Sequence, residues 1–334
     1  MKLETIGWDP ARAEAFAAAN ETDSTPARVV REHRGVYALI YEAGETLAEV
    51  SGRFRHRARM RRDFPAVGDW VAADIPDPAS RAMIHAVLPR RSAFVRRSAG
   101  AKSEEQVVAA NVDKVFLVSG LDHDFNPRRI ERYLTLAWES GADPLIVLNK
   151  ADIHTDPEQA RLQTEAVACG VPILLVSATT GLGLDALRKA LAPGMTGALV
   201  ASSGVGKSTL INALLGHESL RTATVREDDS KGRHTTTHRE LIPLPGGAVL
   251  IDTPGMRELQ LVGDDASLSR AFDEIAELAQ NCRFRDCSHT GEPGCAVQAA
   301  LNEGRLDMER YESYLRQRKE LRHHQIEQDV HLKI

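Results

Sequence analysis

The feature that most constrains the fold is a glycine-rich turn between two apolar segments, TGALVASSGVGKSTLINALLG at residues 196–216. Residues 202–208 read SSGVGKS, close to the P-loop pattern GxxxxGK[ST], with Ala201 in place of the first glycine. Gly204 and Gly206 let backbone N–H groups wrap phosphate oxygens at the positive end of a helix. The pattern therefore predicts a strand, a phosphate-binding loop and a helix, as in an α/β nucleotide-binding domain.

The expected phosphate contacts follow from this loop. Lys207 would reach the terminal phosphates, and Ser208 would ligate Mg²⁺. The methyl group of Ala201 is expected to strain the tight turn, and the alternative interpretation is a loop–helix junction that is only rich in small residues. The residues expected to contact the phosphates are Ser202, Ser203, Gly204, Val205, Gly206, Lys207, Ser208 and Thr209.

A guanine pocket is predicted by NKAD, which spells Asn149, Lys150, Ala151 and Asp152 after the apolar run PLIVL. The Asp152 carboxylate can accept hydrogen bonds from N1–H and the N2 amino group of guanine, whereas adenine offers no matching donors. Lys150 would pack its stem along the base. Ser177 and Ala178 follow a second apolar run, PILLV, where a loop N–H can contact the guanine oxygen.

Two further elements lie downstream of the P-loop. A long polar stretch at residues 221–240 has three consecutive threonines near its end, and the apolar run AVLI leads into Asp252. A threonine hydroxyl in such a loop can complete the Mg²⁺ shell, and Thr236 is favoured over Thr235 for this role. Asp252 can hold Mg²⁺ through water, and the Gly255 N–H can contact the γ-phosphate.

The order of these motifs is unusual, because in an ordinary GTPase the P-loop precedes NKxD. Here NKAD comes first, followed by SAT at 177–179, the P-loop at 202–208, HTTT at 234–237 and DTPG at 252–255. This order indicates a circular permutation, which the sheet tolerates because the original chain ends lie near each other. The segment after Asp252 then leads directly into the C-terminal part of the chain.

Four segments are expected along the chain. Residues 1–34 are predicted to be an extension with one short helix near Pro10. Residues 35–100 contain short apolar or alternating runs separated by turns, which predicts a small antiparallel barrel. Residues 101–265 alternate strands with helices, the pattern of a parallel sheet covered by helices. Residues 266–334 end in a charged helix.

A metal site is predicted in the C-terminal segment. Cys282, Cys287, His289 and Cys295 have the spacing C-x4-C-x-H-x5-C within a Gly- and Pro-rich stretch. Three thiolates and one imidazole fill the tetrahedral shell of Zn²⁺ and leave no place for water, so a structural ion is expected. The alternative is reduced core cysteines beside a surface histidine, and Cys169 is expected to be such a core cysteine.

The net charge of −5 does not predict a nucleic-acid binder, but residues 35–100 hold 11 Arg and 7 Asp or Glu. Arginine occupies alternate positions in this segment: Arg53, Arg55, Arg57, Arg59 and Arg61. If the segment is a strand, all five side chains point to one face, where like charges repel. A polyanion would relieve that repulsion, so an RNA-binding OB-fold is predicted, with a solvated arginine run as the alternative.

The three parts together resemble the circularly permuted, ribosome small-subunit-dependent GTPases of the RsgA (YjeQ/YloQ) family. The resemblance rests on VGDWV (67–71), NKAD (149–152), SGVGKS (203–208), GRHTTTHREL (232–241), DTPGMREL (252–259) and CRFRDCSHTGEPGCAV (282–297). It implies an N-terminal OB-fold barrel, a central circularly permuted α/β P-loop GTPase and a C-terminal, mainly α-helical zinc-binding domain. It also implies binding to the 30S subunit and its 16S rRNA late in maturation, with GTP hydrolysis stimulated by the subunit.

Hydrolysis raises a separate question at the residue after DTPG. Many GTPases keep a glutamine there to orient the attacking water, but this chain has Met256. Methionine cannot orient water, so slow intrinsic hydrolysis is expected. His234 is the candidate for placing the water once the loop is ordered on the ribosome. The expected catalytic residues are His234, Lys207, Thr236 and Asp252.

Other functions remain open from the sequence. One is an RNA-binding scaffold whose nucleotide site turns over slowly or not at all; others are an ATP-dependent kinase and a GTPase acting on tRNA or the 50S subunit. The expected cofactors are GTP/GDP, Mg²⁺ and one Zn²⁺ per chain. No apolar run approaches the roughly 18–20 residues of a membrane-spanning helix. We expect a cytoplasmic monomer with no DNA or membrane partner.

Overall fold

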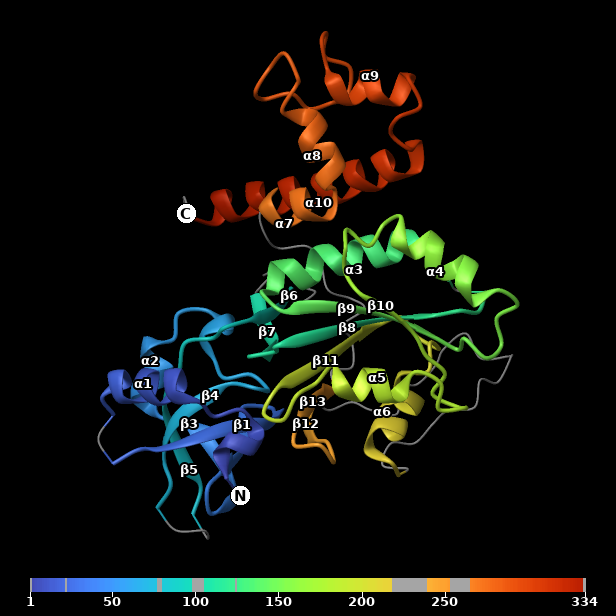
Figure 1. Cartoon of the computed structure of the whole chain (residues 1–334). Helices are drawn as coiled ribbons and strands as arrows, with labels where there is room; N and C mark the ends of the chain where they lie inside the picture. Colours follow the sequence, from blue (N-terminus) through green and yellow to red (C-terminus); the bar gives the residue numbers. More distant parts are fainter. Residues whose placement is uncertain are drawn as a thin grey trace.

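The computed structural model describes residues 2–21, 23–76, 80–97, 105–123, 125–217, 239–252 and 265–332, with Arg97 and 324–332 as backbone only. Figure 1 shows three parts: a β-barrel, a central sheet with helices on both faces, and a group of helices stacked beyond one of those faces. The order of these parts along the chain is that expected from the sequence. None of the described helices is long and apolar enough to cross a membrane.

The N-terminal part is a closed five-stranded barrel. Its strands are β1 (Thr25–His33), β2 (Val36–Tyr41), β3 (Gly44–Val50), β4 (Trp70–Asp74) and β5 (Ala82–Val87). The pairing runs β1–β2–β3–β5–β4 and returns to β1, and β3 with β5 is the parallel pair. Val29, Leu39 and Ile84 are among the fully buried side chains that fill the barrel. This closed pairing agrees with the predicted OB-fold.

The barrel begins earlier than the expected boundary at residue 35. Strand β1 lies inside residues 1–34, which had been interpreted as an extension. The alternation that marks a half-buried strand is missing from β1 because both of its faces are covered. Val29 faces the barrel core, whereas Val30 joins the large core shared with the central domain. The short helix expected near Pro10 is present as α1 (Pro10–Ala19), after the turn η1 (Leu3–Ile6).

The arginine-rich segment is not a strand, which corrects the expected geometry. It forms helix α2 (Gly52–Arg57) and, further on, the short turn η2 (Arg61–Asp63). The Ser51 side chain caps α2 by accepting a hydrogen bond from the Phe54 N–H at 3.1 Å, and Phe54 packs on the barrel core. A helical turn spreads the alternate arginines around its axis. The five arginines therefore do not share one face.

The central domain is a parallel sheet in the order β10–β9–β8–β11–β13, with antiparallel β12 beside β13. Its strands are β8 (Lys114–Gly120), β9 (Asp143–Asn149), β10 (Ile173–Leu175), β11 (Thr196–Ala201), β12 (Glu240–Pro243) and β13 (Val249–Asp252). Its helices are α3 (Pro127–Ser140), α4 (Pro157–Glu165), α5 (Leu184–Lys189) and α6 (Lys207–Leu215). Helices α3 and α4 cover one face of the sheet, and α5 and α6 cover the other (Figure 1). The alternation along β8 explains this, because Val115 packs in one core and Phe116 in the other.

The barrel and the central domain are joined by main-chain pairing between two strands and by the buried guanidinium group of Arg28. Arg31 of β1 pairs with Glu240 of β12, so the two sheets are continuous. The hairpin β6 (Ala93–Arg97) and β7 (Glu105–Ala110) links the parts along the chain. Arg28 is fully buried at the joint, where it donates to Gly68 O, Thr196 Oγ1 and Ile6 O. The N-terminal segment is therefore part of the interdomain core.

The C-terminal part consists of α7 (Asp265–Ala271), α8 (Asp273–Ala279), α9 (Ala296–Asn302) and α10 (Met308–Leu332). Figure 1 shows these helices stacked beyond the α3 face of the central sheet. The loop between α8 and α9 carries the cysteines. Side chains of α10 bond to α3, as in the 2.8 Å hydrogen bond from Thr135 Oγ1 to Gln317 Oε1.

Candidate nucleotide site and metal centre

The P-loop turns directly from β11 into α6. Gly204 and Gly206 have φ of +82° and +88°, a conformation that side chains rarely adopt, so glycine is required at both positions. A Cβ at Gly206 would also lie 2.8 Å from Asn149 Nδ2. Ala201 is extended backbone paired with Val118 in the sheet. Its methyl group therefore causes no backbone strain, contrary to the expectation from the sequence.

The guanine-motif residues contact the P-loop directly. Asn149 Nδ2 donates to Val205 O at 2.8 Å, and the Ala178 N–H donates to Asn149 Oδ1 at 3.1 Å. Lys150 Nζ donates to Gly204 O at 2.6 Å. The loops that follow β9, β10 and β11 are thus tied together, although they are separated by tens of residues in sequence.

Two other guanine-site residues occupy different surroundings. The side chain of Asp152 is exposed to solvent. Ser177 is fully buried, and its Oγ accepts a hydrogen bond from the Thr180 N–H at 3.1 Å. Ser177 therefore holds the turn after β10 together.

At the opposite end of the P-loop, Lys207 Nζ lies 2.5 Å from Asp252 Oδ1. Lys207 begins α6, and Asp252 ends the neighbouring strand β13 with 2 % of its surface exposed. The carboxyl ends of adjacent parallel strands meet at one sheet edge, which is where such folds bind ligands. The P-loop lysine and the DTPG aspartate therefore lie together. Ser208 is the next residue of α6.

Several expected site residues lie outside the described parts of the chain. They are His234, Thr236 and Gly255, together with Thr235 and Met256. The described residues of the site thus comprise the P-loop, the guanine motifs and Asp252.

Two charged residues at this site were missed by the sequence analysis. Asp122 lies 2.5 Å from Lys150 Nζ, and Arg129 Nη1 donates to Ser202 Oγ at 3.0 Å. Both come from the segment that follows β8, the strand between β9 and β11. Because β8 ends at the same sheet edge as the recognised motifs, the position of Asp122 just after this strand was a signal available in the sequence, whereas Arg129, inside α3, had none.

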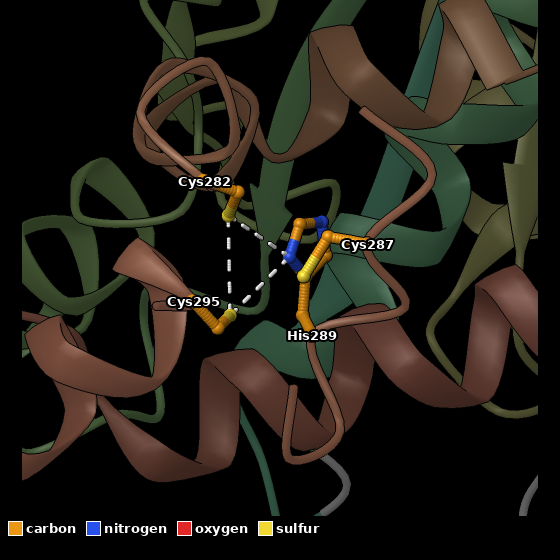
Figure 2. Close-up of side chains that lie close together, drawn as sticks. All are labelled: Cys282, Cys287, His289 and Cys295. Carbon is orange, nitrogen blue, oxygen red and sulfur yellow. Dashed lines mark hydrogen bonds between the residues drawn. The ribbon is translucent and has the colours of Figure 1, made fainter. Parts of the chain in front are cut away.

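The four predicted metal ligands converge in the C-terminal part, and Figure 2 shows their side chains pointing toward a common centre. Cys282 Sγ and Cys295 Sγ are 3.9 Å apart, and each lies 3.6 Å from His289 Nδ1. A tetrahedral Zn²⁺ site with ordinary bond lengths has S···S edges of about 3.8 Å and S···N edges of about 3.6 Å. All four ligand atoms lie within 4.8 Å of one another. The donor set fits zinc in both chemistry and spacing.

The surroundings of the cluster shift the pKa values of its ligands in both directions: burial raises the pKa of Cys287, whereas the pKa values of His289 and Cys282 are lowered. Burial and nearby Arg318 lower the pKa of His289, which favours the neutral imidazole that binds metals. Burial opposes ionisation of Cys282, but the N–H groups of Ala296 and Val297 help to bring its pKa below the ordinary value. Tyr311 and Gln298 both donate to His289 O and hold that loop against the helices.

The arginines of α2 lie on the outside of the barrel. The side chains of Arg53 and Arg57 are about three-fifths exposed and approach Glu21 at 3.5 and 3.9 Å. Arg61 lies 3.6 Å from Glu32. Such exposed pairs contribute little to stability, so these cations are accessible to a competing anion. Arg55 and Arg59 are also exposed.

Comparisons with known proteins agree with this architecture. The profile of the RsgA GTPase family matches residues 87–262. A small ribosomal subunit biogenesis GTPase RsgA of Opitutus terrae is 50% identical over 324 residues, which covers 94% of this chain and 88% of that protein. The crystal structure of YjeQ from Thermotoga maritima has a TM-score of 0.66 and 29% identity, covering 89% of this chain and 98% of that one.

A second solved structure supports the fold alone, because it is only 23% identical. It is YloQ, described as a circularly permuted GTPase, with a TM-score of 0.60 over 91% of this chain and 96% of that one. The order of motifs found here is that of a permuted GTPase, and the barrel and Cys–His cluster flank it on the expected sides. The chain therefore belongs to the RsgA GTPase family, and its nucleotides are GTP and GDP bound with Mg²⁺.

Proposed function

We propose that this protein binds the 30S ribosomal subunit late in its maturation and hydrolyses GTP to GDP and phosphate, with turnover stimulated by the subunit. The observation that carries the proposal is the joining of Asn149 and Lys150 to the P-loop backbone, which makes one nucleotide site from two distant motifs. The relative from Opitutus terrae, named a small ribosomal subunit biogenesis GTPase, supports the choice of subunit. We place the protein in the cytoplasm as a monomer.

Guanine recognition is assigned to Asp152, whose carboxylate accepts from N1–H and the N2 amino group. Lys150 lines the base with its stem while its ammonium group holds Gly204 O and Asp122. Asn149 fixes the distance between this pocket and the P-loop. Ser177 and Ala178 supply the turn beneath the guanine oxygen.

The triphosphate is assigned to the loop from Ser202 to Thr209, with Lys207 at the terminal phosphates. Ser208, Asp252 and Thr236 are the residues that would hold Mg²⁺, which would supply positive charge against the negative charge that develops during hydrolysis. Gly255 is proposed to offer its N–H to the γ-phosphate. The 2.5 Å contact of Lys207 Nζ with Asp252 Oδ1 supports this assignment, because the expected phosphate-binding lysine and an expected metal-binding carboxylate are neighbours.

The attacking water is assigned to His234, because Met256 has no group that can orient it. Substituting His234→Ala should leave GTP affinity unchanged and remove the stimulation of turnover by the subunit. Both quantities are measurable, the first by calorimetry and the second by phosphate release with saturating 30S subunits. Stimulated turnover that survives the substitution would remove His234 from the mechanism.

We assign one structural Zn²⁺ to Cys282, Cys287, His289 and Cys295. The S···S and S···N separations support a closed tetrahedral site, in which no ligand position is left for catalysis. The ion would hold the loop between α8 and α9 and so shape the C-terminal part. Elemental analysis of the purified chain should find one zinc per molecule.

We assign the arginine-rich segment to contact with 16S rRNA. Its exposed cations lie on a helix and turn outside an OB-fold barrel, and their carboxylate neighbours hold them only loosely. Phosphate oxygens of RNA can replace those carboxylates, and the counterions released from the RNA make this exchange favourable in free energy. The exposed arginines then form a curved basic surface instead of a flat stripe. They are Arg53, Arg55, Arg57, Arg59 and Arg61.

The proposed cycle links the two RNA-facing parts to the nucleotide. GTP is proposed to contact residues 221–240 and the segment after Asp252, and these contacts would set the angle between the barrel and the C-terminal part so that both hold the rRNA. Hydrolysis releases that constraint, and the protein leaves the subunit.

Phosphate release measured alone, with 30S and with 50S subunits tests the proposal. Stimulation by 30S alone is expected. A chain that binds 30S but shows no stimulation would be a nucleotide-sensing RNA scaffold, the second candidate that Met256 motivates. Stimulation by 50S alone would contradict the assigned subunit, and competition of ATP equal to that of GTP would contradict the guanine pocket.

A further inference from the structure

Arg129 has no role in the motifs that define the nucleotide site, yet it reaches into the site from α3. Its Nη1 donates to Ser202 Oγ at 3.0 Å, and Ser202 is the first residue after β11. No P-loop pattern requires a partner at this serine. A guanidinium beside an anion-binding loop adds both a fixed donor and a positive charge.

The position of Ser202 indicates which part of the nucleotide this arginine serves. N–H groups of the glycine turn and of the start of α6 cradle the α- and β-phosphates. Ser202 directly follows β11 and begins the loop that carries these N–H groups. A constraint on Ser202 thus acts on the orientation of the loop that holds the phosphates.

The neighbours of Arg129 on α3 are held by the C-terminal part. Glu131 is fully buried and accepts a hydrogen bond from Arg310 of α10 at 2.9 Å. Arg132 forms two hydrogen bonds to Glu320, at 2.6 and 2.8 Å. Within four residues, one side of α3 therefore bonds to the P-loop and another to α10.

We propose that Arg129 is a positioning residue for GTP hydrolysis, which orients the P-loop entry through Ser202 and is itself held in place by the docked C-terminal part. This rests on the proposed GTPase function. A P-loop whose entry is held correctly keeps the terminal phosphate in line for attack, whereas a loosened entry costs rate more than nucleotide affinity. The link also gives the C-terminal part a route to the reacting end of the nucleotide.

The first test uses full-length protein and the variants Arg129→Gln, Arg129→Lys, Ser202→Ala and the Arg129→Gln/Ser202→Ala double variant. For Arg129→Gln we expect kcat to fall about 10-fold, the effect of losing one charge-assisted hydrogen bond. GDP affinity should change less than about 2-fold, because the base and α/β-phosphate contacts are untouched. Lysine keeps the charge and one donor, so Arg129→Lys should recover rate to within about 3-fold of the parent.

The double variant separates this mechanism from a merely structural one. If Arg129 acts through Ser202, the double variant should be no slower than Arg129→Gln alone. Effects that multiply would overturn the positioning role, as would an unchanged kcat in Arg129→Gln. Arg161→Gln, an arginine on α4 that pairs only with glutamates of its own helix in the described structure, is the matched control and should keep the parent kcat.

The second test concerns the C-terminal link. Glu320→Gln removes the charge opposite Arg132 while keeping the shape, and the partly exposed position of Glu320 makes misfolding a small risk. We expect kcat to fall about 3-fold with GDP affinity unchanged, since one ion pair is weakened. An unchanged kcat would overturn the link between α10 and Arg129. A parent protein that hydrolyses no GTP under any condition would instead contradict the proposed function.

Discussion

The metal cluster and the nucleotide site are built in opposite ways. The cluster takes its ligands from 14 consecutive residues, and its four ligand atoms already lie within 4.8 Å of one another. The nucleotide site takes Asn149 and Lys150 from the end of β9, Lys207 from the start of α6 and Asp252 from the end of β13. The metal cluster is therefore formed by one short loop, whereas the nucleotide site forms only when the strands of the parallel sheet are in the correct order. Damage to the cluster should therefore cost structure, and damage to the nucleotide site should cost affinity or rate.

Removal of zinc is expected to have the largest effect. Structural zinc contributes about 10–16 kcal/mol of apparent binding free energy in zinc-finger peptides, so Cys287→Ser should unfold the loop between α8 and α9. Elemental analysis and limited proteolysis would show loss of the ion and new cleavage there. Cys169→Ser is the control, since Cys169 lies outside the cluster. A Cys287→Ser variant with full zinc content would contradict the assignment.

Substitution of the P-loop lysine comes next. Lys207→Ala removes a cation from the terminal phosphates and should weaken GTP binding at least about 100-fold, because charge-assisted bonds are the strong ones. Titration calorimetry measures this, with the exposed Lys189→Ala as control. Zinc content should stay at one per chain. Loss of zinc from Lys207→Ala would contradict the view that the nucleotide site and the metal cluster are structurally independent.

Asn149→Ala tests whether the guanine motif and the P-loop act as one site. The substitution removes two hydrogen bonds, the one that Asn149 donates to Val205 O and the one that it accepts from the Ala178 N–H. The affinity for both GTP and GDP should fall about 10-fold. Nucleotide fluorescence titration would measure it beside Asn302→Ala, an exposed asparagine at the end of α9. Unchanged affinity would mean that the two loops are merely neighbours.

Asp152→Asn should change which base is preferred. The amide loses the acceptor pair for guanine but can donate to the C2 carbonyl of xanthine, so the GTP-to-XTP preference should shift by about 1–3 kcal/mol. Competition binding gives this ratio directly. Asp185→Asn, on exposed α5, controls for the loss of one negative charge. An unaltered ratio would place the base elsewhere.

The smallest effect is expected on the barrel. Arg57→Gln should weaken binding to 30S subunits by a few fold and reduce the slope of log affinity against log salt by about 1. Sedimentation at several salt concentrations measures both quantities. Arg188→Gln, another exposed arginine, should leave the slope unchanged. An equal change in both variants would remove the arginine-rich segment from the interface.

The sequence predicts local chemistry better than it predicts tertiary partnership. The P-loop, NKAD and the metal ligands were recognisable because each motif is short and its spacing follows from backbone or ligand geometry. Strand β1 was missed because it is buried on both faces and shows no alternation. The arginine segment was misassigned because Ser51 and Phe54 favour a capped helix over the strand that alternate arginines suggest.

The charged partners of the site were missed for a different reason. Asp122 and Arg129 belong to no short pattern, and their roles arise only when β8 is placed between β9 and β11. Ala201 shows the converse, because the pattern suggested strain where the chain is ordinary strand. Motif spacing alone contains neither kind of information.

The pairing of Arg31 with Glu240 has a mechanical consequence. Strand β12 immediately follows the segment that contains His234 along the chain, and it lies against β1 of the barrel. A shift of β12 would reach the barrel through the β1–β12 pairing, with the Arg31–Glu240 ion pair and buried Arg28 at the same joint. A change at the nucleotide site that displaced β12 would therefore displace the barrel as well, because the two strands share one sheet.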